Sequence, residues 1–235
     1  MKDLLTRALD AHGGLSRWRE IEAFQLKVSI GGGLWRLKGL PDGLRDVTLR
    51  IQAHRPIVTI TPFGGEARMG HFTPDRVWIE DANGGVVEER ATPRASFAGH
   101  VLTTPWDKLQ ELYFVSYALW NYLATPFVFT EPGFETREIG PHEENGDTWH
   151  RLLVKYPQAS RPTVPSRSCI STRKDYSSVW TTPWMWSATW SPVPPLTTAS
   201  IIPRSVASSF RPCAGRSAAL RRVPCYRVRQ AYCYK

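Results

Sequence analysis

Apolar residues recur at helical spacing at the start of the chain and at every second position soon afterwards. The pattern Leu4, Leu5, Ala8 and Leu9 predicts a helix over residues 2–12, closed by two glycines, with a short second turn at residues 15–18. From residue 21 the period is two, which is typical of a strand with one buried face.

Alternating segments and turn residues predict a series of antiparallel strands. Residues 21–30 and 34–37 form the first expected hairpin, with Gly31-Gly32-Gly33 as its turn. Further strands are expected at residues 44–53, 56–61, 66–72, 76–80 and 85–90. Strands that follow one another every 8–12 residues indicate a meander.

The alternation stops at a strongly aromatic segment. Trp106, Tyr113, Tyr117 and Trp120 fall at helical spacing and predict a helix over residues 106–123, beginning at Thr104-Pro105. Other large side chains occupy most of its remaining surface, so this helix is apolar nearly all round. A helix of that kind is enclosed by the rest of the fold.

Strand-like segments resume after the helix, at residues 127–130, 134–139 and 148–156. Strands, one enclosed helix and further strands predict an α+β fold. We expect a curved antiparallel sheet, a half-barrel, wrapped around one long aromatic helix, with a short N-terminal helix. If this domain ends at residue 157, its last strand lacks a partner, and the product should expose a sheet edge and aggregate.

Charge and composition divide the chain into two parts. Residues 1–157 hold 18 Lys and Arg against 20 Asp and Glu, whereas residues 158–235 hold 12 against 1. The overall charge of +9 therefore comes from the tail. We expect residues 1–157 to form the folded domain and residues 158–235 to be an irregular, basic, Ser/Pro/Arg-rich tail that a protease would remove.

The tail has the composition of a coding region read in the wrong frame. It combines 20 Ser and Thr and 9 Pro with 4 Trp and 4 Cys, a mixture typical of neither disordered tails nor folded domains. Trp184-Met185-Trp186 has a single possible coding sequence, and the frame that starts one nucleotide earlier forces Asp-Val there. The same shift permits Tyr-Phe-Asp near residues 169–172 and Phe-Pro-Thr near residues 208–212. The alternative is a genuine basic tail that binds nucleic acid.

Several motifs of the first 157 residues look familiar together. They are Ala11-His12-Gly13-Gly14, Leu34-Trp35-Arg36-Leu37-Lys38-Gly39, Phe72-Thr73-Pro74-Asp75-Arg76-Val77, Phe97-Ala98-Gly99-His100 and Thr104-Pro105-Trp106-Asp107-Lys108-Leu109-Gln110. On these motifs the chain resembles a family of uncharacterised bacterial proteins, in which Tyr-Phe-Asp and Phe-Pro-Thr elements follow downstream. The order of sheet and helix also resembles the half-barrel of bacterial lipoprotein carriers, in architecture alone.

Candidate chemistry is sparse. His100 precedes the aromatic helix and could act as a general base, or it could be a hydrogen-bonded loop histidine. Arg76 and Glu80 share one strand face, as a paired-charge site or as a solvated face. No two histidines have metal-ligand spacing, the first 157 residues lack Cys, and no nucleotide or hydrolase motif occurs, so we expect no metal and no cofactor.

Three functions remain open at this stage. The favoured one is a carrier of an apolar or amphipathic small molecule, with Trp106, Tyr113, Tyr117 and Trp120 lining its site. The second is a small enzyme that uses His100, and the third is a nucleic-acid binder that depends on a genuine basic tail. No apolar run is long enough to cross a bilayer and the start has no signal-like segment, so we expect a cytoplasmic protein without a membrane span.

Overall fold

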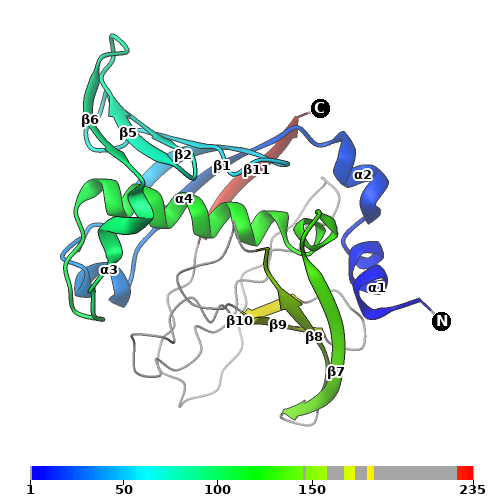
Figure 1. Ribbon diagram of the computed structural model, residues 1–235. Coiled ribbons are helices and arrows are strands. Elements are labelled where there is room, and N and C mark those ends of the chain that lie inside the picture. Colours follow the sequence, from blue (N-terminus) through cyan, green and yellow to red (C-terminus); the bar gives the residue numbers. More distant parts are fainter. Residues whose placement is uncertain (1, 145–146, 158–166, 173–178, 183–226, 235) are drawn as a thin grey trace, which may run out of the picture.

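A computed structural model describes residues 2–144, 147–157, 167–172, 179–182 and 227–234 of the chain (Figure 1). In these residues the strands pair throughout as antiparallel neighbours and form two sheets. The larger sheet has the order β11-β1-β2-β3-β4-β5-β6, and the smaller has the order β10-β9-β8-β7. The α+β class predicted from the sequence is confirmed, but the strands do not belong to one sheet.

Two short helices open the chain. α1 spans Leu4–Ala11, and the Asp3 side chain caps it by accepting a hydrogen bond from the Thr6 amide at 2.7 Å. Gly13, with φ of 101°, reverses the chain into α2, Gly14–Glu20, which is longer than the predicted single turn. The predicted first helix is therefore confirmed. α1 contacts β8 of the smaller sheet, and α2 packs against α1 (Figure 1).

The predicted first hairpin is wrong. β1 spans Ala23–Ile30, but residues 34–37 belong to a short helix, α3, at Gly33–Leu37. β1 pairs instead with β2, Leu44–Gln52, and the segment that contains α3 connects the two strands. Trp35 of α3 is buried against Phe114 and Trp106 near the start of the long helix. The four residues 34–37 fit the apolar spacing of a helix as well as that of a strand. The packing of Trp35 favours the helical turn.

The rest of the larger sheet follows the predicted meander. Its strands are β3 at Val58–Thr61, β4 at Met69–Phe72, β5 at Arg76–Glu80 and β6 at Val86–Ala91. Inward-facing residues alternate with exposed ones on β2, β3 and β5, which is why period two located these strands. A 3₁₀ turn, η1, follows at Pro93–Phe97.

The long helix, α4, spans Lys108–Ala124. Asp107 caps it in a reciprocal box with Gln110, so Trp106 lies just before the helix and not in its first turn. α4 runs across one face of the larger sheet and contacts β3, β4, β5 and β6 (Figure 1). Leu109, Leu112 and Val115 are fully enclosed in this interface. The predicted enclosure of the helix is confirmed.

A second core lies at the C-terminal end of α4. The predicted strand at residues 127–130 is wrong, because these residues form a 3₁₀ turn, η2, at Phe127–Thr130. Three of its four side chains are buried with residues of α1, α2 and β8. A turn buries three consecutive apolar side chains, whereas a strand would send alternate ones to opposite faces.

The smaller sheet contains β7 at Glu135–Glu144 and β8 at Asp147–Lys155, which confirms the last two predicted strands. β9, Arg167–Thr172, pairs with β8, and β10, Val179–Thr182, pairs with β9. β11, Arg227–Tyr234, pairs with β1. The prediction that β8 lacks a partner is therefore wrong. Apart from these three strands, the predicted irregular tail lies outside the described residues.

Candidate functional site

The four aromatic residues predicted to bind a ligand lie along one continuous part of the fold. Trp106 is only 6% exposed and meets the rings of Trp35, Phe97 and Phe114. Trp120 packs against both hydrophobic cores. These contacts give Trp106 and Trp120 a role in core packing, whatever else they do.

Tyr113 and Tyr117 are half-buried, as is Trp120, and their rings lie parallel to each other. Their rings stack with centroids 6.0 Å apart and an interplanar angle of 1°. Both side chains are only partly buried on the surface of the larger core. Phe72 of β4 and Phe97 of η1 contact Tyr113 at its edges. The two tyrosines therefore form an aromatic step on α4, next to η1.

A cation lies beside this step. The Arg94 guanidinium is 5.9 Å from the centroid of the Tyr117 ring. Burial raises the pKa of Tyr117 to about 12, although Arg94 acts in the opposite direction. The Tyr117 hydroxyl therefore remains a hydrogen-bond donor across the physiological range. Arg94 was not a sequence candidate, because an isolated arginine in a polar loop gives no signal.

His100 lies in the loop between η1 and α4. Its Nε2 is 3.5 Å from Gln110 Nε2, and its ring meets Phe97 edge-on. Burial lowers the pKa of His100, the nearby Lys38 cation lowers it further, and Asp107 acts in the opposite direction. No carboxylate hydrogen bond or ion pair is present at His100 within the described part of the chain. The acid partner expected for an enzyme is not found there.

The sequence pattern did not indicate a role for Lys38. It follows α3, is 0% exposed, and sends Nζ to the Val101 and Thr104 carbonyl oxygens at 3.3 and 3.2 Å. The ammonium also lies 4.8 Å from the centre of the Trp106 ring. Burial lowers the pKa of Lys38 to about 8. This amine holds the loop before α4 onto α3.

The outer face of the larger sheet carries a second polar group of side chains. His71 stacks on Trp78 at 4.9 Å, and its Nε2 lies 3.1 Å from a Glu80 carboxylate oxygen. The other Glu80 oxygen accepts a hydrogen bond from the Trp78 indole, while Arg76 of β5 pairs with Glu89 of β6. Of the two alternatives left open for Arg76 and Glu80, the direct pair does not form, because each charge has a different partner.

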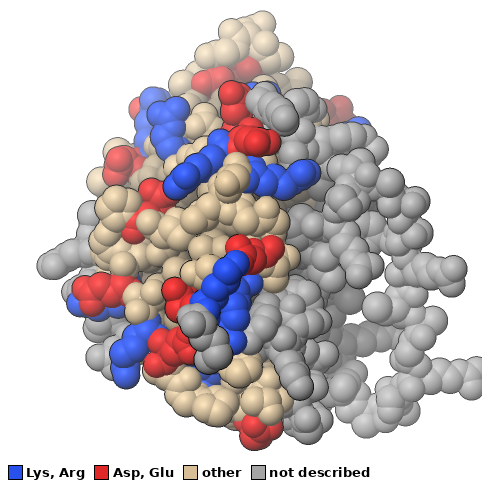
Figure 2. Space-filling view, turned by 90° about the vertical axis from the view of Figure 1, so that its right-hand side faces the viewer, with Lys and Arg blue, Asp and Glu red and all other residues tan. Residues whose placement is uncertain are grey.

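Two observations bear on a metal ion and on a polyanion as ligands. Within the described residues, no three His, Cys, Asp or Glu side chains group in a way that could hold a metal ion. Lys and Arg side chains are interspersed with Asp and Glu on the face shown in Figure 2, without a continuous basic stripe. In the same part of the chain, no helix is long and apolar enough to cross a membrane.

The geometry defines an α+β protein in which an aromatic helix, with a tyrosine pair and an adjacent arginine, packs against an antiparallel sheet. The chain matches no protein-family model, no curated protein and no solved structure. The resemblance to the bacterial family and the shifted reading frame therefore stay predictions.

Proposed function

We propose that this protein binds an amphipathic organic molecule with an acidic head group along the Tyr113–Tyr117 step of α4. The observation that carries the proposal is the stacked, partly accessible tyrosine pair with a guanidinium beside it. The rings offer flat apolar area, and Arg94 and the Tyr117 hydroxyl offer donors. This combination suits a flat or chain-like apolar body that ends in a carboxylate or sulfonate.

The position of the step also supports a binding role. Phe114, the residue after Tyr113, is likewise only partly buried. The half-buried rings therefore keep some aromatic area accessible next to the Arg94 guanidinium. A ligand on these rings would replace water over them while its head group stayed at Arg94.

The test uses two fluorescent probes, anilinonaphthalene sulfonate and the uncharged N-phenylnaphthylamine. We expect the parent protein to bind both, and Tyr117→Ala to weaken both by at least about tenfold. Arg94→Gln should weaken only the sulfonate, because a neutral probe gains nothing from a guanidinium. Tyr122→Ala is the matched control, since five residues at about 100° each turn it to another side of α4.

Stability measurements separate binding from packing. Trp120→Ala should cost the roughly 3–5 kcal/mol of a core truncation, whereas Tyr117→Ala should cost clearly less. Arg55→Gln removes an exposed arginine elsewhere and controls for the loss of charge. A parent protein that binds neither probe, or a Tyr117→Ala variant that is as unstable as Trp120→Ala, would overturn the proposal.

A further inference from the structure

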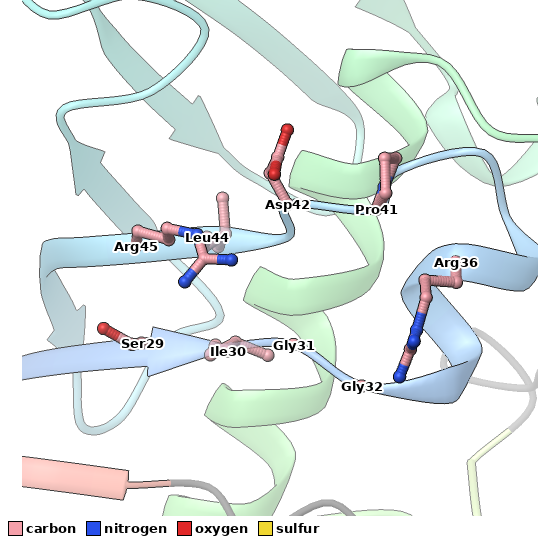
Figure 3. Close-up of a pocket in the computed structure, with 9 residues that line it drawn as sticks. All are labelled: Ser29, Ile30, Gly31, Gly32, Arg36, Pro41, Asp42, Leu44 and Arg45. Carbon is pink, nitrogen blue, oxygen red and sulfur yellow. The ribbon is translucent and has the colours of Figure 1, made fainter.

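A separate pocket of about 330 Å³ opens where β1 and β2 diverge (Figure 3). Its walls include Ser29, Gly31, Gly32, Arg36, Asp42 and Arg45. It shares no residue with the tyrosine step. We propose that this pocket binds the phosphate group of a small phosphorylated molecule.

The local sequence explains why the strands part here. Ile30 and Leu44 are the last paired residues, and Gly43 has φ of 57° and lies so close to Ile30 that an added Cβ would meet its carbonyl oxygen at 2.2 Å. Gly32 has φ of 126°, which other residues rarely adopt. The chain therefore leaves β1 sharply and enters α3, so that a gap is left between the strand ends and the helix.

Two arginines come from opposite sides of this gap. Arg36 reaches down from α3 towards the Gly32 backbone, and Arg45 lies along β2 towards Ile30 and Gly31 (Figure 3). Both arginines are exposed, and neither has a carboxylate partner among the described side chains. Two guanidinium groups at one pocket, neither with a carboxylate partner among the described residues, favour an anion, and a phosphate can accept hydrogen bonds from either of them.

The acidic groups nearby do not neutralise the arginines. Asp46 is held by Ser29, whose hydroxyl accepts from the Asp46 amide at 2.9 Å and donates to its carboxylate at 3.3 Å. Asp42 stands at the rim with its carboxylate turned away from both arginines (Figure 3). A doubly charged phosphate fits two guanidinium groups better than a single carboxylate does. The volume leaves room for a small organic body beside the phosphate.

Glycines provide a sharp test of the pocket itself. An added Cβ at Gly31 meets no atom within 4 Å, so Gly31→Val places a side chain in open space at the pocket wall. Gly33 has the same freedom around a Cβ but does not line the pocket, which makes Gly33→Ala the matched control. Melting temperatures of both variants equal to that of the parent would show that both fold normally.

The experiment is calorimetric titration of the full chain with inorganic phosphate and with glycerol 3-phosphate at constant ionic strength. We expect binding of both, at least tenfold weaker in Arg36→Gln, Arg45→Gln and Gly31→Val and unchanged in Gly33→Ala. Asp42→Asn should bind a few times more tightly, because it removes a like charge from the rim. Absence of phosphate binding by the parent, equal binding of succinate, or unchanged binding in both arginine variants would overturn the proposal.

Discussion

The buried amine of Lys38 should make the folding stability of this protein depend on pH above neutrality. Lys38 is fully enclosed, and its Nζ donates to the carbonyl oxygens of Val101 and Thr104 and lies over the Trp106 ring. In the unfolded chain the same ammonium is surrounded by water. The folded protein therefore holds this proton less tightly than the unfolded protein does.

The magnitude follows from the shift in pKa. Burial lowers the pKa of Lys38 from 10.5 to about 8, and one pKa unit corresponds to about 1.4 kcal/mol, so the full effect is about 3 kcal/mol. Between these two pKa values the unfolded chain binds more protons than the folded one. Stability consequently rises with pH across this window, and the cost of burying the charge is fully present below about pH 8.

The assay compares the parent protein with Lys38→Met by urea unfolding between about pH 7.5 and pH 10. Methionine keeps most of the apolar stem but removes the titrating group. The free energy of unfolding of the parent, relative to that of Lys38→Met, should increase by about 2 kcal/mol over this range. Lys27→Met removes an exposed amine of β1 and reports the general effect of losing a lysine.

A difference between parent and Lys38→Met that stays constant or decreases with rising pH would refute the reasoning. Such a result would mean that the carbonyl and ring contacts compensate fully for the lost hydration of the ammonium. The comparison stops at pH 10 because tyrosines begin to titrate in the unfolded chain near that pH.

Three further predictions concern single features of the fold, and a fourth concerns the gene. Since burial raises the pKa of Tyr117 to about 12, stability should fall as pH rises from about 10 to 12, and Tyr117→Phe should lessen that fall in urea titrations. Because burial lowers the pKa of His100, the free energy of unfolding should fall as pH drops below the ordinary pKa of 6.5. A His100→Asn variant whose free energy of unfolding falls as steeply in this range as that of the parent would contradict this. Gly70→Ala should cost about 1–3 kcal/mol, since its Cβ would lie 2.9 Å from Leu112 and Phe63, whereas Gly140→Ala meets nothing within 4 Å; equal melting temperatures would count against this packing. Resequencing the gene should reveal the shifted frame, and mass spectrometry that detects tail peptides from residues 183–226 of an intact open frame would reject it.

The sequence by itself located most of the strands and the long helix. Alternation is strict on β3 and β5, where every second side chain enters the core, so the period could be read without knowledge of the partners. Asp107 and Gln110 mark the start of α4 by local hydrogen bonds that depend only on neighbouring residues. Most of the enclosure of α4 also followed from its composition, because a helix that is apolar nearly all round has no polar face to turn to water.

The candidate site was predictable only in part. Tyr113 and Tyr117 were identified because both belong to one helical stripe, and their stacking follows from the four-residue spacing. Arg94 and Lys38 were not identified, because each acquires its role from a ring more than twenty residues away in the chain. The Arg36–Arg45 pocket was likewise hidden, since the glycines beside it were interpreted as a tight hairpin turn.

The tertiary structure decided the elements whose local pattern was ambiguous. Residues 34–37 and 127–130 are short apolar runs that fit a strand or a turn, and burial of Trp35 on α4 and of η2 in the second core selects the turn. The division into two sheets also depends on long-range pairing, since β11 joins β1 across almost the whole chain. Local periodicity records which side of a segment is buried, but the partner that buries it is fixed only when distant segments meet.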